Sequence, residues 1–181
     1  AMNMMDPMVQ RLAVAQSTLL EPASLKQSDL RRALACIAEH RVDDADLYFQ
    51  YTRSEAWSLD EGIVKSGSFS IDQGLGVRAV HGEKSAFSYS DGISESILMD
   101  AARATRSIAR QGGGTAAKIK ARMRPAKIAQ HYGFADPIAA MSADDKVALL
   151  QKIESYARAR DRRIRQVMAS LAAEWDVMLV A

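Results

Sequence analysis

Apolar residues recur at intervals of three and four along the first forty positions, which is the spacing of amphipathic helices. Asp6 followed by Pro7 marks a helix start, because a capping side chain precedes a residue that suits the first helical turn. A second apolar stripe follows after a short break. We therefore expect helices near residues 6–20 and 28–40.

From residue 45 the period changes to two, and glycines punctuate a series of alternating runs. Strands joined by such short polar turns should pair antiparallel, because a parallel crossover needs a dozen or more residues. The region 45–90 is therefore predicted to form an antiparallel or mixed sheet. The individual strands are expected at 45–51, 55–59, 63–65, 69–71, 75–80 and 85–89.

Helical spacing returns twice in the second half of the chain. Ser94 is a plausible cap for a helix near 94–110, and the run that begins at Ser142 resembles a capping box for a helix near 142–163. Between the two helices, residues 115–141 lose the pattern and predict a long connection. The apolar tail from residue 166 reads as a strand.

These elements predict an α+β fold in which the sheet packs against the helices. We expect an N-terminal α+β domain with a trailing linker over residues 1–141. Residues 142–181 would be a helix and strand leading into a truncated second domain. An exposed apolar strand at a chain end is unusual, so we expect a fragment of a longer protein.

Composition narrows the class of protein. With 181 residues, 48% apolar residues and a net charge of +2, the chain should fold around a core and favours no particular partner by charge. The single cysteine, Cys36, excludes an intrachain disulfide and any multi-cysteine metal site. The sequence contains no run of about 18 apolar residues, which a membrane-spanning helix would need. The composition suits the cytoplasm.

Residues alone show no catalytic constellation. The run Gly74-Leu-Gly76-Val-Arg-Ala79 formally fits a dinucleotide motif, but these glycines open a strand where that motif needs a helix. The histidines are too far apart for a helix-borne zinc pair, and a cluster of three aspartates before the first strand is typical of a solvated turn. No catalytic or metal-binding residue is therefore predicted in this chain.

Basic residues are concentrated between positions 103 and 127, without intervening acids. Such a segment could hold phosphates. Aromatic stacking partners are sparse around it, which favours a solvated loop. Binding of nucleic acid or of a partner protein through residues 103–127 is kept as the alternative function, with nucleic acid unlikely and no membrane contact expected.

Several spaced blocks together resemble the N-terminal region of the TldD/PmbA proteins, on the TldD side. They are Asp46-Leu-Tyr-Phe-Gln50, Asp60-Glu-Gly-Ile-Val-Lys-Ser-Gly67, Asp72-Gln-Gly-Leu-Gly-Val-Arg-Ala79, Gly82-Glu-Lys84 and Phe87-Ser-Tyr-Ser-Asp91. Later matches are Asp136-Pro137, Met141-Ser142, Lys146 and residues 167–181, so the resemblance covers about residues 23–181.

The resemblance implies a bacterial cytoplasmic zinc metallopeptidase that acts with a paralogous PmbA/TldE-like subunit. It links such pairs to peptide maturation, antitoxin degradation and, by name, DNA gyrase modulation. The zinc site of the family lies on a His-Glu-x-x-x-His helix, which this chain lacks. The parent protein is therefore expected to be a zinc peptidase acting on unfolded peptides, and this 181-residue chain alone to be inactive.

Within the predicted sheet, Gly74, Gly76 and Arg78 are the residues we expect to contact a peptide or a neighbouring domain. The two glycines would permit close backbone approach, and Arg78 could meet a carboxylate or a carbonyl. The alternative interpretation is structural: a bend in the sheet, with Arg78 held in an ion pair.

Overall fold

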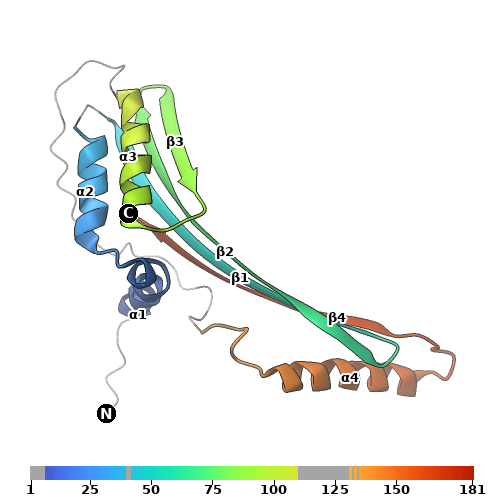
Figure 1. The fold of residues 1–181 in the computed structure, drawn as a ribbon. Coiled ribbons are helices and arrows are strands. Elements are labelled where there is room, and N and C mark those ends of the chain that lie inside the picture. The colour runs from blue at the N-terminus through green and yellow to red at the C-terminus, as the bar shows by residue number, and fades with distance from the viewer. Residues whose placement is uncertain (1–6, 40–41, 110–130, 132, 134) are drawn as a thin grey trace, which may run out of the picture. The chain divides into compact units, whose positions relative to one another are not determined.

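The computed structural model describes residues 7–39, 42–109, 131, 133 and 135–181 (Figure 1). Its internal contacts divide the chain into two compact units. Unit 1 contains residues 1–51, 72–134 and 177–181, and unit 2 contains residues 52–71 and 135–176. The predicted boundary at residue 141 separates this domain from a second domain that continues past residue 181. That boundary stays a prediction.

One sheet contributes strands to both units, in the order β3-β2-β1-β4. The strands are β1 (Asp44–Asp60), β2 (Ile63–His81), β3 (Lys84–Ser90) and β4 (Met168–Val180). Strand β2 pairs antiparallel with β3. Leu47 and Ala181 exchange two backbone hydrogen bonds of 2.9 Å, as opposed residues of antiparallel strands do. The predicted α+β class with an antiparallel sheet is confirmed.

The strands are longer than predicted, because runs that we expected to be separate are continuous. Residues 45–51 and 55–59 belong to β1, and the three runs between 63 and 80 belong to β2. Gly67 illustrates why a glycine need not end a strand. A Cβ atom there would lie 2.7 Å from the Ala56 carbonyl oxygen and 3.2 Å from the Trp57 ring, so glycine permits a close approach within the sheet.

Two tight turns connect the first three strands. Glu61 and Gly62 both have positive φ, at 51° and 79°, as the common two-residue hairpin turn requires. Gly82 has a φ of 58° in the turn between β2 and β3. These turns fix which residues of neighbouring strands lie opposite each other.

In unit 1, helices cover one face of the sheet. The chain begins with α1 (Pro7–Ala15), the π-helix η1 (Gln16–Leu20) and the 3₁₀-helix η2 (Glu21–Ala23), where a single helix was predicted over 6–20. Helices α2 (Gln27–Ile37) and α3 (Glu95–Ala109) lie side by side (Figure 1). The core that they share with the sheet includes Leu30, Ile37, Leu47, Phe49, Leu75, Val77, Ala79, Leu98 and Ala102.

In unit 2, α4 (Ala143–Arg160) accompanies residues of β1, β2 and β4. The fully buried leucines of unit 2 are Leu59 on β1 and Leu150 on α4. The helix ends three residues before the predicted residue 163, because Asp161 is extended and accepts hydrogen bonds from the Arg163 backbone and guanidinium. Most of the predicted connection over 115–141 lies outside the described residues.

Candidate functional site

The three predicted contact residues lie in β2, within unit 1. Their neighbours Leu75 and Val77 are fully buried on the face that the helices cover. Because successive side chains of a strand point to opposite faces, Gly74, Gly76 and Arg78 share the face that none of the described helices covers. The structure therefore brings the three residues to one face of the sheet.

The two glycines make room for aromatic side chains of β3. A Cβ atom on Gly76 would lie 2.9 Å from the Phe87 ring, and one on Gly74 would lie 2.6 Å from both the Tyr89 hydroxyl oxygen and the Ser90 carbonyl oxygen. The close approach that glycine permits is thus made by residues of this chain. Phe87 and Tyr89 nevertheless remain 65% and 57% exposed.

Arg78 is held by carboxylates of β1. Its Nε donates to Asp46 at 2.6 Å, and a terminal nitrogen donates to Asp44 at 3.2 Å. Asp46, with a smaller contribution from Asp44, raises the pKa of Arg78. This is the ion pair that the alternative, structural interpretation of Arg78 predicts. It also gives a structural role to two of the three aspartates that cluster near the start of the first strand. A contact of Arg78 with a peptide or another domain stays a prediction.

Strand β3 is an edge of the sheet and follows a two-residue turn after β2. The closing pair of such a hairpin, His81 and Lys84, is of the hydrogen-bonded type, and the types then alternate along the strands. The backbone N–H and C=O groups of Ser85, Phe87 and Tyr89 therefore point away from β2. Among the described residues, no backbone hydrogen bond from another element reaches them. The edge can accept another extended strand.

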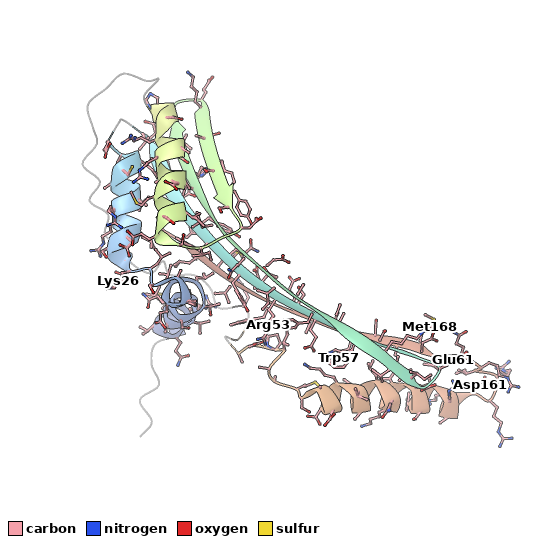
Figure 2. The ribbon with its side chains drawn as sticks, viewed as in Figure 1. Lys26, Arg53, Trp57, Glu61, Asp161 and Met168 are labelled. Atoms are coloured by element: carbon pink, nitrogen blue, oxygen red, sulfur yellow. The ribbon has the colours of Figure 1, made fainter. Side chains whose placement is uncertain are left out.

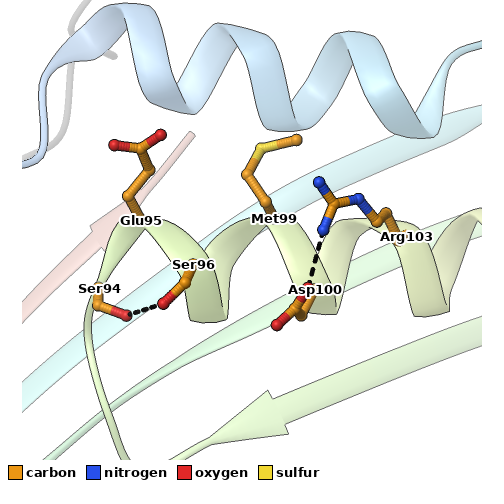
Figure 3. Close-up of a pocket in the computed structure, with 6 residues that line it drawn as sticks. All are labelled: Ser94, Glu95, Ser96, Met99, Asp100 and Arg103. Atoms are coloured by element: carbon orange, nitrogen blue, oxygen red, sulfur yellow. Dashed lines mark hydrogen bonds and ion pairs between the residues drawn. The ribbon is translucent and has the colours of Figure 1, made fainter.

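Polar side chains line an open hollow along the N-terminal part of α3 (Figure 3). Ser94, Glu95, Ser96, Met99, Asp100 and Arg103 form its wall. Glu95 is ion-paired with Arg32 of α2, and Arg103 with Asp100 at 2.8 Å. These charges already have partners, and the hollow presents no convergent set of groups for chemistry.

Metal-binding side chains do not gather within the described part of the chain: no three His, Cys, Asp or Glu residues are placed to hold an ion there. Cys36 is buried, and His81 lies 3.8 Å from Asp43. His40 lies outside the described residues. The side chains that are described do not fit a zinc site.

The basic segment falls largely outside the described residues, which omit 110–130. Two arginines of this segment lie in the described part of α3, and each is ion-paired with an acid. Arg103 pairs with Asp100, and Arg106 pairs with Glu39. The described residues also include no helix long and apolar enough to cross a membrane.

Sequence reasoning missed a charged cluster between β1 and α4 in unit 2 (Figure 2 labels Arg53 and Trp57). Lys146 is ion-paired with Glu55 and donates to the Ile138 carbonyl oxygen at 2.9 Å. Arg53 is ion-paired with Asp136. The Lys146 contact, aided by Trp57, lowers the pKa of Glu55. The sequence signals were the family matches at Asp136 and Lys146, but nothing in the sequence indicated that these residues pair with Arg53 and Glu55.

The chain is similar to known proteins over most of its length. It shares 37% identity over 164 residues with the metalloprotease TldD homologue of Haemophilus influenzae, a match that covers 91% of this chain and 34% of that protein. The chain thus spans about a third of the length of this relative.

Two solved structures share the fold. A candidate modulator of DNA gyrase from Bacteroides thetaiotaomicron matches with a TM-score of 0.57 and 13% identity, over 85% of this chain and 36% of that one. TldE from Thermococcus kodakarensis matches with a TM-score of 0.54 and 14% identity, over 84% of this chain and 35% of that one. Residues 45–109, which include β2, β3 and α3, match the family model described as PmbA/TldA metallopeptidase domain 1. The chain therefore belongs to the TldD/PmbA family and contains its N-terminal region.

Proposed function

We propose that this chain is the N-terminal domain of a TldD-like zinc metallopeptidase that acts in the cytoplasm with a PmbA/TldE-like partner on unfolded peptides. The identity of 37% with a protein named metalloprotease TldD homologue is the observation that carries this proposal. The zinc would be bound by the parent protein outside these residues. Peptide maturation, antitoxin degradation and gyrase modulation are the processes in which such a peptidase would act.

The open edge of β3 suggests what this domain contributes. An extended peptide that adds to a sheet edge is held by backbone hydrogen bonds, so its binding depends little on its sequence. The outward groups of Ser85, Phe87 and Tyr89 offer such bonds to a substrate strand, beside the face that carries Gly74, Gly76 and Arg78. This domain would then hold the peptide while the metal centre of the parent protein cleaves it.

The decisive experiment compares the parent-length protein with this 181-residue chain. With the partner subunit present, the parent-length protein should bind stoichiometric zinc and hydrolyse an unfolded peptide, and a chelator should abolish the activity. Replacing the two histidines of its His-Glu-x-x-x-His helix should abolish both properties. The chain of 181 residues should show neither. A parent-length protein without zinc or hydrolysis would refute the proposal.

A further inference from the structure

The face of the unit 1 sheet that no described helix covers carries exposed apolar side chains at both of its edges. On β3 they are Phe87 and Tyr89, and on β4 they are Met178 and Val180, which are 54% and 63% exposed. Exposed aromatic and aliphatic side chains grouped on one face are typical of an interaction surface. We call these four side chains, with the residues between them on β1 and β2, the bare face.

The sheet geometry places these four side chains on the same side. Leu47 and Ala181 are opposed residues, so Met178 and Val180 lie across from even-numbered residues of β1. Leu47 and Phe49 are buried under the helices, and the even-numbered residues therefore point to the other face. On β3, Phe87 lies opposite Arg78 and Tyr89 opposite Gly76, which share that face.

The charges in the middle of the bare face are already paired within the sheet. Arg78 forms ion pairs with both Asp44 and Asp46 from the neighbouring strand, so its guanidinium is not free to bind an anionic ligand. The glycines beneath Phe87 and Tyr89 let the rings lie close to the backbone of β2. A surface with apolar margins and a centre of mutually paired charges suits a broad protein contact better than a small charged ligand.

The length of the relatives indicates what covers this face. The chain matches about a third of the Haemophilus influenzae protein, and the matched family model is that of a first domain. A protein of that length has about twice as much chain again with which to bury an apolar face of its first domain. Two aromatic rings exposed on a sheet face leave apolar surface in water, and burying that surface against another part of the protein is favourable.

We propose that the bare face is the docking surface for the polypeptide that follows residue 181 in the parent-length protein. This inference rests on the proposed function only in requiring a longer parent. Phe87 and Tyr89 are its apolar anchors on one side, and Met178 and Val180 are those on the other.

Fluorine NMR with 4-fluorophenylalanine measures the docking on the unsubstituted sequence, and variants serve only to assign signals. The chain contains four phenylalanines. Phe87 is the reporter, the fully buried Phe49 is the internal reference, and Phe69, which is 60% exposed in unit 2, is the exposed control. Single Phe→Leu variants assign the signals, and a soluble gadolinium chelate measures the accessibility of each ring.

In the 181-residue chain, the chelate should relax the Phe87 signal several-fold more than that of Phe49. In the parent-length protein this excess should be lost, with Phe49 unchanged. Equal relaxation of Phe87 in both proteins would overturn the proposal. So would protection that appears in the short chain only at high concentration, which indicates a second copy, or protection in the long protein only after the partner subunit is added.

A second variant separates docking from folding. Phe87→Glu places a charge on an exposed position, so the 181-residue chain should keep its urea midpoint while the parent-length protein becomes several-fold more sensitive to proteolysis between its domains. Zinc content and peptide hydrolysis are measured on the same parent-length sample. A zinc-binding, active protein whose Phe87 stays accessible would overturn the docking proposal alone, whereas a protected Phe87 without zinc or hydrolysis would overturn only the proposed function.

Discussion

Lys146 and Glu55 show how much one residue contact can decide in unit 2. Their side chains are only 7% and 13% exposed, and they are ion-paired between α4 and β1. Taking two charges out of water is unfavourable unless each keeps its partners. Glu55 also accepts from the Trp57 indole at 2.7 Å, and Lys146 also donates to Ile138, so both charges are well satisfied.

Replacing Lys146 by Met should therefore destabilise the protein by about 3–5 kcal/mol, because Glu55 keeps a buried charge without its cation. Urea unfolding measures the loss. In the double variant with Glu55→Met, most of the stability should return, since an apolar pair replaces the ion pair. A double variant that is no more stable than Lys146→Met alone would contradict this account of the pair.

The same contact predicts a dependence on pH. Lys146 lowers the pKa of Glu55 below its ordinary value of 4.5, so the charged form is favoured in the folded state. Its contribution to the free energy of unfolding is complete above pH 4.5 and is lost as the pH falls through the lowered pKa. Urea midpoints between pH 7 and pH 3 should fall less steeply for Glu55→Gln than for the unmodified chain. Parallel curves would refute the prediction.

Gly74 is a residue whose smallness the sheet requires. A Cβ atom there would lie 2.6 Å from the Ser90 carbonyl oxygen, which is backbone and cannot turn away. Gly74→Ala should cost about 1–3 kcal/mol in urea unfolding, as overpacking usually does. Gly133→Ala is the matched control, because a Cβ atom there meets no described atom within 4 Å. Equal effects of both substitutions would show that close packing at Gly74 is not the cause.

At the scale of elements, the N-terminus of α4 is the best example of a local signal that holds. The cap predicted at Ser142 is present in its N-cap half: the Ser142 hydroxyl oxygen accepts from the Asp145 backbone N–H at 3.1 Å. The Ser94 hydroxyl likewise accepts from Ile97 at the start of α3. Such caps depend only on residues three apart, so sequence alone can reveal them.

Ser142→Ala should cost about 1 kcal/mol and speed amide hydrogen exchange in the first turn of α4. Ser155→Ala, in the same helix, is the control, because its hydroxyl only donates to the Gln151 carbonyl oxygen within the helix. A faster exchange in both variants, or in neither, would argue against a specific capping effect at Ser142.

Strand lengths could not be predicted in the same way. The glycines and polar residues in β1 and β2 look like breaks when each run is considered alone. They remain in strands because neighbouring strands supply the hydrogen bonds and fill the space beside glycine, as the Trp57 ring does at Gly67. Some of these neighbouring strands are far away in the sequence. Strand β4, for example, pairs with β1 where Ala181 bonds to Leu47.

At the scale of the whole molecule, β1, β2 and β4 connect the two contact units, because each of these strands has residues in both. Disrupting one of these strands in one unit therefore disturbs the same strand where it continues in the other. We expect the chain to unfold cooperatively despite its division into two units.

Two signals can test this cooperativity. Both tryptophans, Trp57 and Trp175, belong to unit 2, whereas far-UV circular dichroism also reports α2 and α3 of unit 1. The urea transitions followed by fluorescence and by dichroism should coincide, and Lys146→Met should shift both equally. A fluorescence transition at lower urea than the dichroism transition would show that unit 2 unfolds separately.

The amino-acid sequence by itself determined the α+β class, the short turns between strands, the helix caps and the family, because periodicity, turn chemistry and spaced motifs are encoded locally. Tertiary structure decided the rest. It placed Phe87 and Tyr89 over Gly76 and Gly74, and it paired Arg78 with acids of another strand and Lys146 with Glu55. Contacts of this kind depend on the register and the face of strands, which a shift of one residue would reverse.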